Sequence, residues 1–263
     1  MGSRAVAPTL TDEELADFLA LTRGADTVEL KLTMLLSDRS RAGAALGVDP
    51  LDGQIRQVYF FDTPDLVLNQ RGLVVRARRV QGKGDDSVVK LRPVDPKNLS
   101  PELRASRNFG VEIDAMPGGY VCSGSMKHTL DPTSVKDTVA GKIPVHELFS
   151  KEQRSLYGEH APEGIGLDDL AILGPILVLK VKFAPEDYAR KLAAELWLYP
   201  DNSMILELST RCAPSEAFQM AAELRIFLGQ RDVDLTGEQA TKTKKALEFF
   251  SQRLAVLGQE GGG

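Results

Sequence analysis

Charged residues spaced two positions apart inside aliphatic runs are the feature of this sequence best suited to chemistry. Because side chains alternate between the two faces of a β-strand, each charged pair shares one face and its aliphatic neighbours share the other. Such strands suit the binding of a polyanion by cations, with carboxylates holding a hard divalent metal against it. Five segments carry such a pair: Glu29 with Lys31, Arg76 with Arg78, Lys90 with Arg92, Glu112 with Asp114, and Lys180 with Lys182.

A solvated sheet face is the alternative, since it gives the same alternation on any single strand. Solvated faces usually carry Thr, Ser, Gln and isolated charges, whereas here charge pairs recur on strand after strand. The repetition favours one apolar surface and one surface lined by charge of both signs.

Composition limits the classes of function. The chain has 263 residues, 43% hydrophobic and 26% charged, which is enough for one large or two small domains with a core. Its net charge of -5 argues against a general nucleic-acid binder, so no nucleic-acid partner is expected. We find neither a run of about 20 apolar residues nor a signal peptide, and therefore predict a cytoplasmic protein with no membrane partner. The sequence does not indicate an oligomeric state.

Cysteine and histidine offer little chemistry. Cys122 and Cys212 lie far apart, without a neighbouring cysteine or a ligand-spaced histidine, so neither a disulfide framework nor a zinc site is predicted. The three histidines share no spacing, and triad, Walker and Rossmann signatures are absent from the sequence.

The chain divides into three predicted parts. Residues 1–25 form a lead-in and a helix, which Thr11 and Glu14 start as a capping box. Residues 26–250 form the main domain, with an insertion at about 118–172 that consists of a long loop and a helix over 145–157. Residues 251–263 are a helix end and a flexible Gly-rich tail.

Strands dominate the main domain. Together with helices outside them, they predict an α+β fold in which an antiparallel barrel leaves no exposed edge. A short helix over 39–46 and two closing helices near 215–228 and 238–257 complete the prediction. The expected strands are 27–36, 54–62, the arginine strand after Gly72, 87–92, the acidic strand around Glu112, 176–183, 191–199 and 204–210.

In order along the chain, several of these motifs resemble those of one family. Thr27-Val28-Glu29-Leu30-Lys31 is similar to a Glu-x-Glu-x-Lys entry motif, and Tyr59-Phe60-Phe61-Asp62-Thr63-Pro64 to a Tyr-Tyr-Asp-Thr-Pro hairpin. The Arg76-Ala77-Arg78 strand, the later acidic and basic strands and Glu207 follow in the same order. Over about residues 26–250 the sequence resembles the CYTH superfamily, the triphosphate tunnel metalloenzymes.

The resemblance implies an eight-stranded antiparallel tunnel that binds a triphosphate chain and one or two divalent cations, Mg²⁺ or Mn²⁺. We therefore expect a metal-dependent triphosphatase that hydrolyses inorganic triphosphate or a small organic triphosphate. The resemblance assigns Glu29 and Lys31 to catalysis. It assigns four carboxylates to the metal: Glu29, Glu112, Asp114 and Glu207. It assigns the substrate to eight cations: Lys31, Arg76, Arg78, Lys90, Arg92, Lys180, Lys182 and Lys242.

Physical chemistry supports this expectation. Small barrels normally fill their interior with aliphatic side chains, and inward cations would repel one another unless a ligand carried several negative charges. A triphosphate carries several negative charges. Arginines can fork onto phosphate oxygens, whereas lysines supply point charge.

Two departures from the motifs keep other functions open. Thr27 and Ser209 stand where the family carries glutamates, and the side chain of Asp26 points to the opposite face from that of Thr27. A one-metal enzyme, a slow enzyme, or a module that binds polyphosphate or a nucleotide without cleaving it would each fit. A class IV adenylyl cyclase is a further alternative.

Some assignments also have a structural alternative. Lys242 belongs to a run of lysines on a helix, which is usually a solvated face. Arg92 precedes Pro93 at a strand end, where its side chain could face solvent instead of the tunnel. For Glu195 the alternative is a position at the mouth of the tunnel. Trp197 either stacks on a base or thiazole ring or simply packs.

Overall fold

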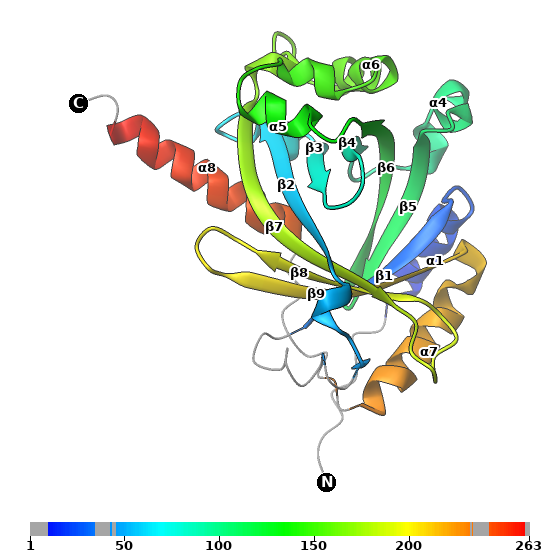
Figure 1. Ribbon diagram of the computed structural model, residues 1–263. Coiled ribbons are helices and arrows are strands. Elements are labelled where there is room, and N and C mark those ends of the chain that lie inside the picture. Colours follow the sequence, from blue (N-terminus) through cyan, green and yellow to red (C-terminus); the bar gives the residue numbers. More distant parts are fainter. Residues whose placement is uncertain (1–9, 35–42, 44–45, 232, 234–241, 261–263) are drawn as a thin grey trace.

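The computed structural model describes residues 10–34, 43, 46–231, 233 and 242–260 (Figure 1). Nine strands and several helices alternate along this part of the chain. The strands are β1 (Thr27–Met34), β2 (Gln54–Asp62), β3 (Leu73–Val80), β4 (Asp85–Leu91), β5 (Phe109–Met116), β6 (Gly119–Leu130), β7 (Ala171–Phe183), β8 (Leu192–Leu198) and β9 (Met204–Cys212). The α-helices are α1 (Asp12–Thr22), α3 (Val67–Gln70), α4 (Pro101–Ala105), α5 (Ser134–Val139), α6 (Lys151–His160), α7 (Ala217–Gly229) and α8 (Lys242–Glu260). The 3-10 helices are η2 (Pro50–Asp52), η3 (Pro96–Asn98), η4 (Val145–Leu148), η5 (Leu167–Asp169) and η6 (Pro214–Glu216).

The strands close into one barrel in the order β1-β5-β6-β4-β3-β2-β7-β8-β9, and β9 pairs again with β1. The expected barrel is thus confirmed, but two details of the prediction were wrong. The described residues form nine strands instead of eight, and the sheet is mixed, because β1 and β5 run parallel. That parallel pair sets Glu29 beside Asp114 and Thr27 beside Glu112.

The ninth strand is β6, which lies where the sequence predicted a long loop. Ser123, Gly124 and Ser125 indicated a break, yet they pair with β5 on one side and, from Gly124 onward, with β4 on the other. A Cβ on Gly124 would lie 2.5 Å from Cζ of Phe109. Gly124 therefore makes room for the ring of Phe109 and does not mark a turn.

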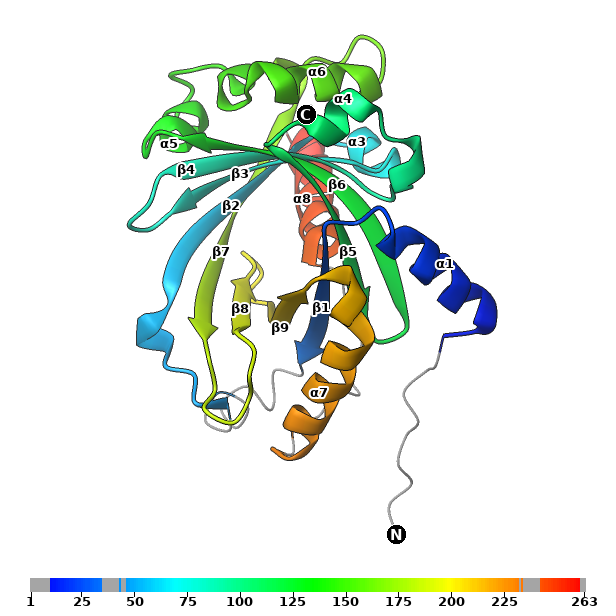
Figure 2. The ribbon, with the colours of Figure 1, turned by 90° about the vertical axis from the view of Figure 1, so that its right-hand side faces the viewer.

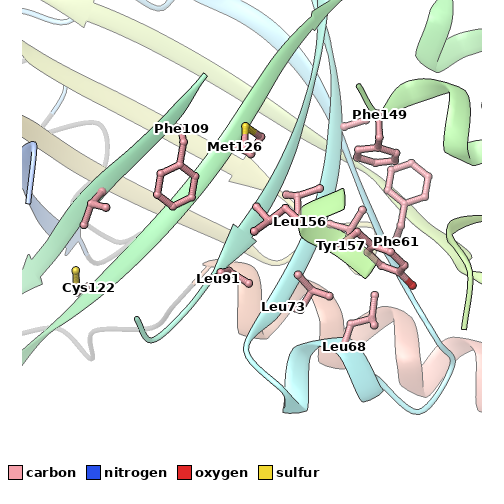
Figure 3. Close-up of a cluster of buried hydrophobic side chains, with 14 of the residues drawn as sticks. Phe61, Leu68, Leu73, Leu91, Phe109, Cys122, Met126, Phe149, Leu156 and Tyr157 are labelled. Atoms are coloured by element: carbon pink, nitrogen blue, oxygen red, sulfur yellow. The ribbon is translucent and has the colours of Figure 1, made fainter. Parts of the chain in front are cut away.

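The outer face of the barrel carries the aliphatic residues that alternate with the charged ones. Val75 and Ala77 on β3, and Ile113 on β5, are buried beneath the helices. Phe61 meets Phe149 edge to face with ring centroids 5.9 Å apart, and Leu156 and Tyr157 of α6 join the same cluster (Figure 3). The aliphatic residues that alternate with the charge pairs are thus outside and covered, so the charge pairs point inward.

Helix α6 shows how one polar side chain anchors the cover. Gln153 is fully buried; its amide nitrogen donates to the carbonyls of Ser87 on β4 and Met126 on β6, and its amide oxygen accepts from the Ser87 hydroxyl. The helix expected over 145–157 is divided here: η4 ends at Leu148, and Ser150 caps α6 through a capping box.

Three further helices pack against the barrel (Figure 2). The capping box of α1 at Thr11 and Glu14 is confirmed. Helix α7 packs Leu224, Phe227 and Leu228 against β1, β8 and β9. Helix α8 packs Leu247 and Phe250 against residues that include Phe60 and Trp197. Most of the helix predicted over 39–46, and the start of the one predicted from 238, lie outside the described residues.

Candidate functional site

A cavity of about 1490 Å³ occupies the inside of the barrel. Thirteen cationic side chains and seven carboxylates among the described residues line it, so its wall is positive although the whole chain is negative. The wall includes every charged residue assigned from the sequence: Glu29, Lys31, Arg76, Arg78, Lys90, Arg92, Glu112, Asp114, Lys180, Lys182, Glu207 and Lys242.

Three carboxylates gather on one side of the cavity, where β1 and β5 run parallel. Glu29, Glu112 and Asp114 each offer an oxygen, and these oxygens lie within 4.8 Å of one another. Carboxylate oxygens are the ligands that Mg²⁺ and Mn²⁺ prefer, so this donor set fits a hard divalent ion. Glu207, the fourth carboxylate predicted to bind metal, is not a member of this group.

Two cations each contact two carboxylates of this cluster. Nζ of Lys31 lies 2.5 Å from Asp114 and 3.1 Å from Glu29. A guanidinium nitrogen of Arg211, on β9, lies 3.2 Å from Glu29 and 2.9 Å from Glu112. The cluster is therefore largely neutralised by the chain itself.

The pKa values of the cluster follow from this arrangement. Burial would raise the pKa of Glu29, but Lys31 and Arg211 outweigh it and hold that pKa at about 2. Asp114 likewise has a pKa below its usual range, because Lys31 and Lys90 overcome its burial. Burial and the neighbouring Glu29 raise the pKa of Glu112. Burial would lower the pKa of Lys31, but Asp114 and Glu29 raise it.

Lys90 and Arg92 approach Asp114 from β4 and the residue after it, at 3.5 and 3.7 Å. Arg92 thus lines the cavity, and the solvent-facing alternative does not apply to it. Its position depends on Gly72, whose carbonyl accepts from the Arg92 amide. Gly72 has a φ of +74°, and a Cβ there would lie 2.3 Å from the Arg92 carbonyl oxygen.

The wall across the barrel from β1, on β2 and β3, is cationic. Arg78 forks onto Asp86 with two contacts of 2.8 Å. Arg76 differs, because its buried Nε finds no hydrogen-bond partner in the described part of the chain, and burial lowers its pKa to about 10. An orphaned inward donor is what an absent anionic ligand would leave behind.

Three of the wall cations that sequence reasoning missed lie on strands: Arg56, Lys127 and Arg211. None belongs to a charge pair. Arg56 alternates with Gln54 and Val58, Lys127 with Ser123 and Ser125, and Arg211 with Ser209 and Glu207. Extending the two-residue alternation beyond the obvious pairs would have found them.

A second charged network closes the side of the cavity next to α8. Lys242 contacts Glu195 and Glu207, both at 2.6 Å, and Lys180 contacts Glu195 at 2.6 Å. Lys180 and Lys242 hold the pKa of Glu195 well below its usual range despite burial, whereas burial raises the pKa of Glu207 although Lys242 opposes it. Lys242 is therefore an inward lysine and does not belong to a solvated face.

Two residues of this region need separate mention. Trp197 is buried, donates its indole N–H to Glu195 at 3.0 Å and lies under Lys242. This arrangement supports packing over stacking on a ligand ring. Lys182 lines the cavity although it is exposed to solvent.

Comparison with known proteins supports the fold. No protein-family model and no curated protein sequence matches the chain. A putative adenylate cyclase from Bacillus halodurans matches the structure with a TM-score of 0.58 at 13% identity, over 84% of this chain and 97% of that one. HpAC1 from Hippeastrum, a putative adenylyl cyclase described as having a dominant triphosphatase activity, matches with a TM-score of 0.61 at 18% identity, over 82% of this chain and 92% of that one.

The chain therefore shares the fold of these two proteins, in agreement with the fold that the resemblance predicted. At such identities the likenesses extend to the fold and not to the activity. Within the described ranges, none of the helices combines the length and apolarity that crossing a membrane requires.

Proposed function

We propose that this protein is a divalent-metal-dependent triphosphatase that hydrolyses inorganic triphosphate or a small organic triphosphate inside the barrel. The observation that carries the proposal is the unpartnered Nε of Arg76 in a cationic wall that faces the carboxylate cluster. A positive wall with an orphaned donor suits a polyanion, and a cluster of hard oxygen donors suits its metal.

The chain's own residues would act mainly by positioning and neutralisation, which is most of what phosphoryl transfer requires. Arg76 would fork onto non-bridging phosphate oxygens, while Lys90, Lys127 and Lys180 supply point charge. Lys31 lies between Asp114 and Glu29, where it can bind a terminal phosphate oxygen beside the carboxylates. A divalent ion held by Glu29, Glu112 and Asp114 would withdraw charge from the phosphate oxygens and assist attack by water.

A binding module without catalysis is the second candidate. It is favoured by the contacts of Lys31 and Arg211, which already engage the oxygens that a metal would need. An adenylyl cyclase is the third candidate, and it is suggested by the names of the two structural neighbours.

Phosphate release tests all three functions. We would incubate the protein with tripolyphosphate, ATP or thiamine triphosphate in Mg²⁺, Mn²⁺ or EDTA, and analyse the ATP products for cyclic AMP. Glu29→Gln removes a carboxylate of the cluster, and Glu147→Gln on the exposed surface of η4 is its control.

We expect metal-dependent phosphate release that is lost in Glu29→Gln and retained in Glu147→Gln. Cyclic AMP with pyrophosphate would instead identify a cyclase. No release, together with a higher melting temperature in tripolyphosphate, would leave the binding module as the function.

A further inference from the structure

Arg211 occupies an unusual place in the barrel. It is the third inward position on β9 after Glu207 and Ser209, and it lies directly opposite Glu29 in the β1–β9 register. Its guanidinium reaches two carboxylates of the cluster, at 3.2 Å from Glu29 and 2.9 Å from Glu112. One side chain thus bridges two of the three residues that could hold a metal.

The guanidinium and a divalent ion need the same oxygens. A carboxylate lone pair that accepts an N–H bond is not free to coordinate a metal, and a second positive charge a few ångströms away repels it. The inward neighbours Thr27 and Ser209 are uncharged, so no further carboxylate on these positions offsets Arg211.

Arg211 and Lys31 hold the cluster in different ways. The side chain of Lys31 is 19% exposed and makes its shortest contact with fully buried Asp114. The side chain of Arg211 is 53% exposed, so it can leave the cluster without being drawn through a packed core. Of the two cations, Arg211 is therefore the one that can exchange.

We propose that Arg211 is a built-in cation that competes with the divalent ion for Glu29 and Glu112. In the free protein it keeps the metal affinity low, and a bound triphosphate attracts the guanidinium away from the carboxylates and opens them to metal. This inference rests on the proposed function only in its assumption that the carboxylate cluster binds a divalent ion.

Direct Mn²⁺ binding tests the proposal without any turnover. Calorimetry or the electron paramagnetic resonance signal of free Mn²⁺ would be measured without phosphate, for the wild type, Arg211→Gln and Arg211→Lys. Arg190→Gln is a matched control, because Arg190 also joins two carboxylates, Glu216 and Glu223, outside the cluster.

We expect Arg211→Gln to bind Mn²⁺ at least about tenfold more tightly than the wild type, and Arg190→Gln to stay within about twofold. Arg211→Lys should show a smaller gain, because an ammonium lacks the fork that bridges two carboxylates. If Arg211→Gln does not fold, as judged by its melting curve, the gain in Arg211→Lys decides.

Unchanged or weaker Mn²⁺ binding in the folded Arg211 variants overturns the proposal, as does the absence of Mn²⁺ binding in every variant. Its failure can be told apart from failure of the proposed function. Tighter Mn²⁺ binding without any hydrolysis retains the competition and rejects the triphosphatase. Hydrolysis with unchanged Mn²⁺ affinity does the reverse.

Discussion

Lys90 and Lys31 are buried to a similar degree in the cavity wall, yet the pKa values of their ammonium groups shift in opposite directions. Lys31 contacts both Asp114 and Glu29, and its pKa is raised. Burial lowers the pKa of Lys90 to about 8, because Asp114 at 3.5 Å only partly offsets it and the cations Lys31 and Arg92 lower it further. Closer carboxylates keep Lys31 protonated, whereas a longer contact and neighbouring cations let Lys90 lose its proton near pH 8.

This difference predicts a pH dependence of triphosphate binding in EDTA. A triphosphate binds the protonated form of Lys90 and raises its pKa, so affinity should be steady below about pH 8 and fall as pH rises above it. Lys90→Arg keeps its charge across this range, and its affinity should fall less between pH 7.5 and 9.5. Calorimetric titration with tripolyphosphate measures both profiles.

The ligand's own titration is common to the two proteins, so the difference between their profiles isolates residue 90. Parallel profiles for the wild type and Lys90→Arg would contradict the role given to Lys90.

Helix α6 illustrates how an element is held on the barrel by a satisfied polar network. Gln153 connects the N-terminus of its own helix with β4 and β6, because its amide oxygen also accepts from the Ser150 backbone. Every hydrogen bond of this amide is made in a site closed to water. Removing one partner of such a network leaves buried groups unpaired.

Gln153→Ala should therefore lower the free energy of unfolding by roughly 1–3 kcal/mol, since the carbonyls of Ser87 and Met126 lose their donor. Urea denaturation followed by circular dichroism measures the change. Gln219→Ala is the control, because Gln219 is an exposed residue of α7 whose amide donates to Glu223, and its effect should stay within about 0.5 kcal/mol. Equal effects of the two substitutions would show that the network contributes nothing beyond helix propensity.

The elements also show where sequence patterns are sufficient. Two-residue alternation identified the strands that carry charge pairs, because one face is apolar and the other charged. Strand β6 was missed because its centre is Ser123-Gly124-Ser125, and only the neighbouring Phe109 reveals why residue 124 must be a glycine. The parallel pairing of β1 with β5 is a long-range property that local patterns do not encode.

For the whole molecule, the residues of the site were easier to predict than their partners. The charged pairs were expected to face inward, and they line the cavity. The sequence could not indicate that Arg211 reaches Glu29, or that Lys242 lies between Glu195 and Glu207, because these contacts join residues far apart in the chain. Partner choice is decided by barrel closure and by the docking of α8.

Barrel closure also sets a conflict between stability and binding. Among the described cations, Arg76 lies in a wall with Arg56 and Arg78, has a buried Nε without a partner and has its pKa lowered to about 10, mainly by burial. Replacing such a buried charge by an apolar side chain of similar length is often neutral or stabilising. The charge of Arg76 therefore lowers the stability of the ligand-free protein. A bound polyanion would offset this loss by accepting a hydrogen bond from Nε.

In the ligand-free protein, Arg76→Met should accordingly leave the free energy of unfolding unchanged or raise it by up to about 2 kcal/mol. Its melting temperature should then be equal to that of the wild type or higher. The same substitution should reduce the increase in melting temperature that tripolyphosphate produces, an increase that corresponds to about 2.7 kcal/mol at a ligand concentration 100 times the dissociation constant. Thermal unfolding with and without tripolyphosphate in EDTA measures both effects. Arg79→Met is the matched control, because Arg79 lies on the same strand but does not line the cavity, and it should keep the wild-type response to ligand. A lower melting temperature for ligand-free Arg76→Met, combined with an undiminished response to tripolyphosphate, would show that Arg76 supports the fold and does not bind the ligand.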